Sequence, residues 1–295
     1  VAFSAQLNDG GYINIPNTEI FIVPANGIFT SDGTTITNID TIPRMGFPKA
    51  FGITLGEPSI NNNGTVAFRE IGRFSRNSSI IRTTDGRNIA SIYGSPFVGQ
   101  PLINDAGNIA YIDNLQSIFI NNGTSQTLVA SGSQGSQIGA IAFNNQGIIA
   151  YTTAAIYGLG NKLLTTNPLF PTVAETNGAF SSLGQPSIND EGTVAFLANL
   201  STGGADILND EVIATGDTLL GSTVTQLGFS SQGLNNSGQI TFYATLANGI
   251  SGIFRADPQT IQSQVVPEST NTWGIVTFGV VVMGLIKKRV LSDRS

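Results

Sequence analysis

Oxygen-bearing side chains recur in turn-like stretches of this sequence and raise the question of calcium binding. The candidates are Asn104 with Asp105, Asn189 with Asp190, and Asp85. Calcium takes six to eight oxygen ligands, and dedicated loops supply several carboxylates at alternating positions. Each of these stretches offers one or two carboxylates. Because Asn and Asp also stabilise turns through the neighbouring backbone, turn formation accounts for them without a metal, and we expect no metal site.

A second group of carboxylates lies in "DILNDEVIATGD" (206–217). Two carboxylates about 5–10 Å apart can hydrolyse a glycosidic bond. The same stretch also fits two short strands with acids at the corners of a hairpin, so a polysaccharide-degrading enzyme stays an alternative. The acids are Asp206, Asp210, Glu211 and Asp217.

Arginines are concentrated in residues 68–87, which hold five of the nine basic side chains in residues 1–286. Gathered on one surface, they would bind an acidic polysaccharide or lipopolysaccharide, because guanidinium groups form paired hydrogen bonds with anionic oxygens. A solvated hairpin with scattered charges is the interpretation that we favour, and the patch is the alternative. The residues of this anionic-ligand patch are Arg69, Arg73, Arg76, Arg82 and Arg87.

Two residue types are missing from the 295 residues: there is no Cys and no His. Disulfides, thiol nucleophiles and Ser-His-Asp triads are therefore excluded, together with the most common metal ligand and general base. Residues 1–286 carry eighteen acidic side chains against the nine basic ones. An acidic body is a poor match for a phosphate backbone, so we expect no nucleic-acid partner.

The candidate turns belong to a phrase that recurs along the chain. Its copies are "INNNGTVAF", "INDAGNIAY", "FNNQGIIAY", "INDEGTVAF" and "LNNSGQITF", and the opening "VAF" matches the end of a further copy. The repeated glycines are 43, 40, 45 and 46 residues apart. Asn followed three residues later by Gly, between apolar runs, predicts a hairpin turn in which Gly takes positive φ. These structural turn positions are Asn61 and Gly64, Asn104 and Gly107, Asn144 and Gly147, Asn189 and Gly192, and Asn235 and Gly238.

Each repeat contains four short apolar runs separated by turns, which predicts four strands. A period of about 40–45 residues with four strands is typical of a β-propeller blade. We therefore predict an all-β, β-propeller-like array of about six four-stranded blades over residues 1–265, with a β-solenoid as the alternative. Because the sequence opens inside a repeat, the first blade is expected to be truncated, with residues before Val1 completing it. Strands such as 194–197 are apolar on both faces, which indicates stacked sheets.

The C-terminal residues break this pattern. Residues 272–286 carry no charge and are followed by Lys287, Lys288 and Arg289. As a helix this segment would be about 22 Å long, and an interfacial Trp273 and snorkelling lysines would help it to span a core of about 30 Å. We predict a single hydrophobic helix in a membrane, with the repeats on the outer side. A buried C-terminal strand or helix is the alternative.

The tail resembles a PEP-CTERM sorting signal. The resemblance rests on the motif Val266, Pro267 and Glu268, the span 272–286 and the basic cluster; Ser269 stands where the family has Pro. It implies recognition and cleavage by an exosortase-type membrane enzyme in an exopolysaccharide-secreting bacterium. Residues 1–265 resemble tandem NxxGxxAF-repeat proteins, and residues 266–295 would form the sorting segment. Neither resemblance implies a catalytic activity or a cofactor.

Together these observations predict an exported, non-catalytic repeat protein of the cell surface or extracellular matrix. It would be anchored by its C-terminal span before processing, and it would bind glycan or protein through a blade face. The alternatives are an enzyme with carboxylates in a propeller channel and a purely structural matrix protein.

Overall fold

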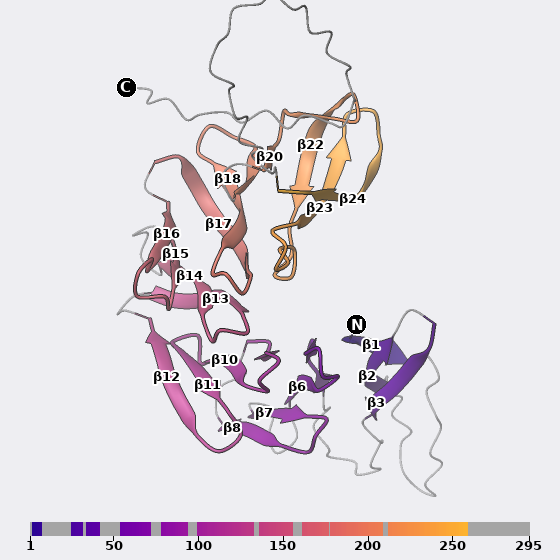
Figure 1. The fold of residues 1–295 in the computed structure, drawn as a ribbon, viewed down its shortest axis with the longest axis vertical. Helices are drawn as coiled ribbons and strands as arrows, with labels where there is room; N and C mark the ends of the chain where they lie inside the picture. The colour runs from indigo at the N-terminus through magenta and orange to yellow at the C-terminus, as the bar shows by residue number, and fades with distance from the viewer. Residues whose placement is uncertain are drawn as a thin grey trace, which may run out of the picture. The chain divides into compact units, whose positions relative to one another are not determined.

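The computed structural model describes residues 2–7, 25–31, 34–41, 54–71, 78–93, 99–132, 136–155, 161–176, 178–208 and 212–258. In these ranges every regular element is a β-strand (Figure 1). The all-β class predicted from the sequence is therefore confirmed. The predicted C-terminal helix falls within residues 266–295, which lie outside the described residues.

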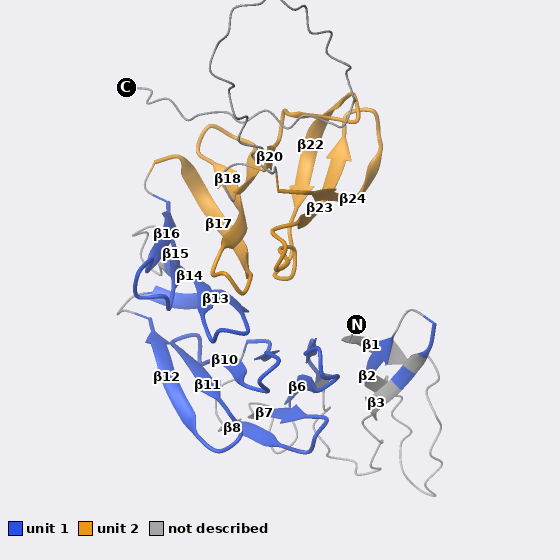
Figure 2. Cartoon of the chain, in the orientation of Figure 1, with its two compact units in different colours: residues 1–177 blue, residues 178–295 orange. Residues whose placement is uncertain are grey.

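The chain divides into two compact units, residues 1–177 and residues 178–295 (Figure 2). Unit 1 contains four antiparallel sheets, which follow one another along the chain. The first sheet consists of β1 (Ala2–Leu7), β2 (Ala25–Ser31) and β3 (Ile36–Thr41); the second of β4 (Thr54–Leu55), β5 (Ser59–Ile60), β6 (Val66–Ile71), β7 (Ser78–Thr83) and β8 (Asn88–Tyr93); the third of β9 (Leu102–Ile103), β10 (Ile109–Asp113), β11 (Ser117–Asn121) and β12 (Gln126–Ser131); and the fourth of β13 (Ser136–Phe143), β14 (Ile149–Ala155), β15 (Lys162–Thr165) and β16 (Thr172–Glu175).

Unit 2 contains two further sheets, each with four strands. The predicted four-stranded antiparallel sheets are thus confirmed in the third to sixth sheets. The second sheet has five strands because its leading strand is interrupted, so that β4 and β5 both pair with β6. The fifth sheet consists of β17 (Phe180–Ile188), β18 (Val194–Leu200), β19 (Ala205–Leu208) and β20 (Ile213–Ala214), and the sixth of β21 (Thr218–Leu219), β22 (Ser222–Gly228), β23 (Ile240–Leu246) and β24 (Ser251–Ala256).

The recurring Asn-x-x-Gly phrase forms the hairpin that leads into β6, β10, β14, β18 and β23. In the third sheet the N–H of Asn104 donates to the oxygen of Asn108 at 3.1 Å, and the N–H of Gly107 donates to the oxygen of Asn104 at 2.9 Å. The five repeat glycines have φ between +73° and +83°. Side chains with a Cβ are strained at such φ values, so local chain geometry explains why Gly recurs at this position.

The three residues after each turn explain how neighbouring sheets stack. In unit 1, Ala67 of β6 packs in one buried cluster with Ile109 and Tyr111 of β10. Ala110 of β10 packs in turn with Ile149 of β14. In unit 2 the same relation joins β18 to β23. A small side chain on one face therefore meets large side chains on the next sheet, which allows the sheets to pack closely.

The ring of Tyr111 offers a test of this packing. Tyr111 is buried against Phe119, with ring centroids 5.8 Å apart. Burial, with a smaller contribution from the negative charge of Asp113, raises the pKa of Tyr111 to about 12. A raised pKa means that the fold favours the neutral phenol, so this stabilisation is complete below pH 10 and is lost as the pH rises toward 12.

We expect Tyr111→Phe to remove this alkaline sensitivity while keeping the ring. Relative to the variant, the wild type should lose about 2–3 kcal/mol of unfolding free energy between pH values of about 9 and 12. Urea denaturation of both proteins across this range measures the difference. Parallel stability curves would show that the phenol does not titrate in a buried environment.

Candidate functional site

The repeat asparagines hold the turns together, both within a sheet and from one sheet to the next. The side-chain oxygen of Asn104 accepts the N–H of Asn108 at 3.0 Å, and its amide donates to the main-chain oxygen of Asn144 at 3.3 Å. Asn61 donates in the same way to the oxygen of Asn104 at 3.0 Å. We call these residues the asparagine ladder; its members are Asn61, Asn104 and Asn144 in unit 1, and Asn189 and Asn235 in unit 2, where the corresponding bond is 3.5 Å long.

The next residue of each turn makes a second set of bonds between sheets. The carboxylate of Asp105 accepts the backbone N–H of Asn62 at 2.8 Å and the side-chain amides of Asn62 and Asn145 at 2.8 and 2.9 Å. The N–H of Asp105 donates back to Asn145 at 2.9 Å. In unit 2, Asp190 and Asn236 form the same reciprocal pair, with distances of 2.9 and 2.6 Å.

These contacts show the structural role of the turns that were considered as calcium sites. The oxygens of Asp105 and Asp190 accept amide N–H groups from adjacent turns, so they act as links between sheets. Among the described residues, no group of three or more acidic side chains is placed to hold a metal ion.

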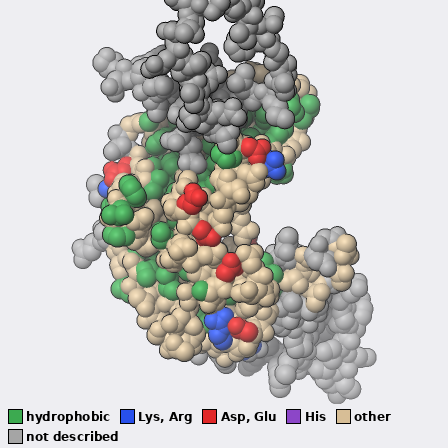
Figure 3. Space-filling model, viewed as in Figure 1, with side chains coloured by type: hydrophobic (Ala, Val, Ile, Leu, Met, Phe, Trp, Pro, Cys, Tyr) green, Lys and Arg blue, Asp and Glu red, His purple; other side chains and the backbone are tan. Residues whose placement is uncertain are grey.

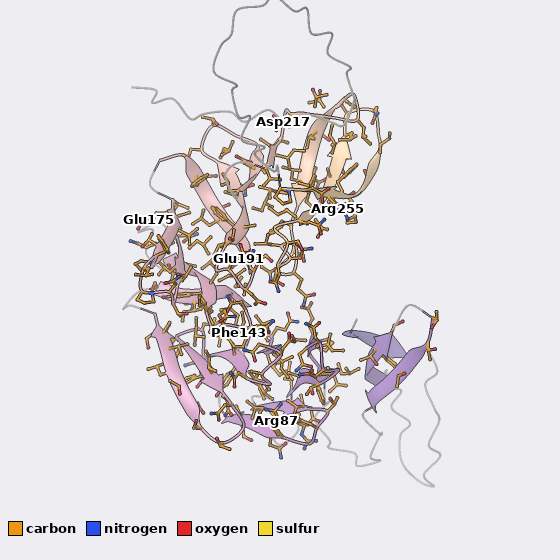
Figure 4. All side chains as sticks on the ribbon, viewed as in Figure 1. Arg87, Phe143, Glu175, Glu191, Asp217 and Arg255 are labelled. Carbon is orange, nitrogen blue, oxygen red and sulfur yellow. The ribbon has the colours of Figure 1, made fainter. Side chains whose placement is uncertain are left out.

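Asp85 and Arg87 belong to the turn between β7 and β8. Arg87, labelled in Figure 4, donates from Nε to Asp85 at 2.9 Å and from Nη1 to the main-chain oxygen of Gly107 at 2.8 Å. The hydrogen bond from Arg87 holds the pKa of Asp85 below its ordinary value; partial burial opposes this, and a hydrogen bond from Thr83 supports it. Arg87 is thus engaged in joining the second sheet to the turn of the third.

Two other predicted patch residues, Arg69 and Arg82, lie on opposite faces of the second sheet. Arg69 is directly opposite Ile81, and Arg82 is directly opposite Phe68. Opposed residues share a face and successive residues alternate, so the two guanidinium groups point to different sides. The structure therefore does not bring these two arginines together on one surface.

Each of these two arginines is also partly buried. Nη1 of Arg82 lies 3.4 Å from Oε1 of the buried Glu70. Burial lowers the pKa of Arg69, and the negative charge of Glu57 partly offsets the effect. The remaining predicted patch residues, Arg73 and Arg76, lie outside the described residues.

The candidate catalytic carboxylates are also distributed over different turns and strands. Asp206 is buried on β19, directly opposite Ala198 and Ala214 on the neighbouring strands. Asp217 accepts the N–H of Ala214 at 2.8 Å and so closes the turn after β20. Asp210 and Glu211 lie outside the described residues.

The sorting and membrane residues cannot be placed in the same way, because the structure describes nothing beyond residue 258. Within the ranges that it does describe, there is no helix long and apolar enough to cross a membrane. The residues concerned are Val266, Pro267, Glu268, Trp273, Lys287, Lys288 and Arg289.

Sequence reasoning assigned no role to two features that connect the sheets. The residue after each repeat Asn alternates strictly between Asn and Asp along the chain, and this alternation was the available signal for the second set of bonds. A serine before the motif also links sheets: Ser59 accepts the N–H of Ile103 at 3.2 Å, and Ser187 accepts the N–H of Leu234 at 3.1 Å. The alternating residues are Asn62, Asp105, Asn145, Asp190 and Asn236.

Comparison with known proteins gives remote likenesses. No protein-family model matches the chain, and no curated protein matches it in sequence. An oligogalacturonate lyase in complex with manganese is similar over 78% of this chain and 73% of its own, with 12% identity and a TM-score of 0.49. A puromycin-hydrolysing peptidase of Mycobacterium tuberculosis is similar over 80% of this chain and 40% of its own (14% identity, TM-score 0.42), and YCF48 bound to D1 peptide over 83% and 79% (13% identity, TM-score 0.39). We draw no functional conclusion from them.

Proposed function

We propose that this chain is an exported, non-catalytic repeat scaffold whose sheets are successive blades of a β-propeller-like array. The observation that carries this proposal is that the polar side chains of the turns form hydrogen bonds between adjacent sheets. Asn104 and Asp105, the best candidates for chemistry from their types alone, bind the turns of adjacent sheets to one another. Such bonds give a rigid support and already engage the side chains that a ligand would need.

The proposed role of the scaffold is to bind glycan or protein partners at the surface of the cell or in an extracellular matrix. Only 11% of the residues are charged, so the polar side chains of the chain are mostly the uncharged Asn, Gln, Ser and Thr. A surface rich in hydroxyl and amide groups suits partners that are recognised through neutral hydrogen bonds. Rigid presentation of such groups lowers the entropy lost on binding.

The proposed localisation rests on the C-terminal sequence. The motif Val266, Pro267 and Glu268, the uncharged span 272–286 and the following basic cluster support export and temporary anchoring in a membrane. Processing by an exosortase-type enzyme would then release the repeats to the exterior. The proposed partners are this enzyme, the membrane before cleavage, and a polysaccharide.

The test uses the extracellular form of the whole protein on an array of acidic and neutral polysaccharides. We expect binding to at least one polysaccharide, with no new reducing ends or unsaturated products after prolonged incubation. Mass spectrometry of the same preparation should show that the C-terminal segment has been removed.

Three outcomes would contradict parts of this proposal. Cleavage of a polysaccharide that is lost in Asp206→Asn or Asp217→Asn would establish an enzyme. Absence of binding across the array would leave a purely structural role. An intact C terminus at Ser295 in the extracellular form would exclude processing of the tail.

A further inference from the structure

The hairpin loop between β15 and β16 exposes large apolar side chains. Leu169 is 77% exposed and Phe170 is 68% exposed, and Val173 follows at 37%. We call residues 167–173, with the sequence "NPLFPTV", the apolar finger. Figure 3 shows hydrophobic side chains gathered at the left edge of the molecule, in the region that Figure 1 labels β14–β16. Neighbouring exposed apolar side chains of this size usually mark an interaction site.

At the tip of the apolar finger, the N–H groups are satisfied within the loop. The N–H of Leu169 donates to the side chain of Asn167 at 3.0 Å, and the N–H of Phe170 donates to the main-chain oxygen of Asn167 at 3.2 Å. Pro168 and Pro171 have no N–H to satisfy. The N–H groups of the two exposed residues therefore keep their partners when the loop leaves water, which lowers the cost of transferring it to a lipid surface.

Further bonds fix the shape of the finger at its base. The hydroxyl of Thr165 donates to the main-chain oxygen of Phe170 at 2.7 Å, and it accepts the N–H of Asn167 at 3.2 Å. The N–H of Thr165 donates to the oxygen of Pro171 at 3.0 Å. Leu169 and Phe170 are thus presented by a preorganised turn, which lowers the entropy cost of inserting them.

The charges around the finger indicate what kind of surface it would meet. Residues 163–174 carry no charge, and the nearest flanking pair, Lys162 and Glu175, neutralise each other at 2.8 Å. The whole chain has a net charge of −6. Anionic lipid headgroups repel the acidic protein that carries this neutral loop, whereas zwitterionic headgroups do not.

We propose that the apolar finger inserts Leu169 and Phe170 into the interfacial layer of a zwitterionic lipid bilayer. The choice of a membrane over an apolar protein pocket rests on the proposed function, in which a C-terminal span holds the protein beside a membrane. The finger then acts as a second contact that fixes the orientation of the fourth sheet on the bilayer. The C-terminal tether reinforces this weak contact because it raises the effective concentration of the finger at the bilayer.

The experiment uses a tryptophan reporter in the full chain reconstituted with phosphatidylcholine vesicles. The only Trp of the chain is Trp273, so Phe170→Trp combined with Trp273→Phe gives a single reporter on the finger. We expect its emission to shift to shorter wavelength on vesicle binding. We also expect strong quenching by brominated phosphatidylcholine and loss of quenching by aqueous iodide.

A matched control places the reporter on another exposed apolar position of unit 1. Leu128 of β12 is 54% exposed. Leu128→Trp in the same Trp273→Phe background should remain accessible to iodide and insensitive to brominated lipid. If the Phe170→Trp reporter behaves like this control, or becomes shielded only when another protein is added, bilayer insertion is excluded.

The unaltered protein separates failure of this proposal from failure of the proposed function. Quenching of Trp273 by brominated lipid reports the C-terminal segment alone. If lipid quenches Trp273 in the unaltered protein but iodide still reaches the Phe170→Trp reporter in the variant, the C-terminal span is in the membrane and insertion of the finger is refuted. If lipid quenches the Phe170→Trp reporter but does not quench Trp273 in the unaltered protein, insertion of the finger is supported and membrane anchoring by the C-terminal span is refuted.

Discussion

Asn104→Ala should lower the free energy of unfolding by about 2–4 kcal/mol, whereas the same change at Asn235 should cost about 1 kcal/mol. Asn104 is buried, and its loss removes partners from the N–H of Asn108 and the oxygen of Asn144. Asn235 has the same place in its turn, but it is exposed and its amide donates to Gln239 within that turn. Urea denaturation of the two variants compares bonds between sheets with bonds inside a turn. Equal losses would show that the asparagine ladder contributes only to its own turns.

Asn104→Asp tests the hydrogen bond from the Asn104 amide to the main-chain oxygen of Asn144 by replacing the donor with a carboxyl group. The new carboxylate would keep the acceptor for the N–H of Asn108 but would face the main-chain oxygen of Asn144 without a proton to donate. Burial and this repulsion favour the neutral acid, so the pKa of the introduced carboxyl should be raised. The stability deficit should therefore grow as the pH rises above about 4, and it should shrink in acid, where the O–H can donate to Asn144. A deficit that does not change with pH would show that the side chain is not held at this buried position.

The parts of the fold that were predictable from sequence are those governed by residues close together in the chain. The turns at Gly107 and Gly192 require positive φ, and each is followed by an apolar strand, so hairpins and their period could be recognised. Four strands per repeat followed from counting the apolar runs. The apolar residues on both faces of strands such as 194–197 also predicted that sheets would stack.

The hydrogen bonds between turns of adjacent sheets were not predictable, because they join residues about 40 positions apart. These bonds show which polar side chains hold the fold together and which could bind a ligand. Turn formation was already the favoured role of the Asn104–Asp105 stretch, but only the placement of Asn62 and Asn145 beside Asp105 shows that its carboxylate links sheets. The grouping of Arg69 with Arg82 failed for a related reason. Which face of the sheet a residue occupies depends on strand register. The arginine patch was inferred only from the number of arginines in residues 68–87, which gives no information about register.

The second large effect is expected in the core of unit 2. Phe242→Ala should cost about 3–5 kcal/mol, because the ring is 3% exposed and stacks on Phe254 with centroids 5.9 Å apart. Ile253→Ala on the adjacent strand is the matched control, since Ile253 is 74% exposed and should change stability by less than about 0.5 kcal/mol. Thermal and urea unfolding of both variants measures these losses.

The same variant distinguishes a local loss from a cooperative one. Phe242 shares its buried cluster with Ala195 of β18 and Ile207 of β19, so its ring stabilises the packing between the fifth and sixth sheets. Amide hydrogen exchange in Phe242→Ala should therefore accelerate in β18 and β19 together with β23, although the substitution lies in β23 alone. If only β23 and β24 exchange faster, each sheet is stable by itself and the repeated aromatic position fills a gap within one sheet. Joint acceleration would instead show that the repeat unit is incomplete without its neighbour, which is the physical reason for a motif that places a small side chain on one face and a ring on the other.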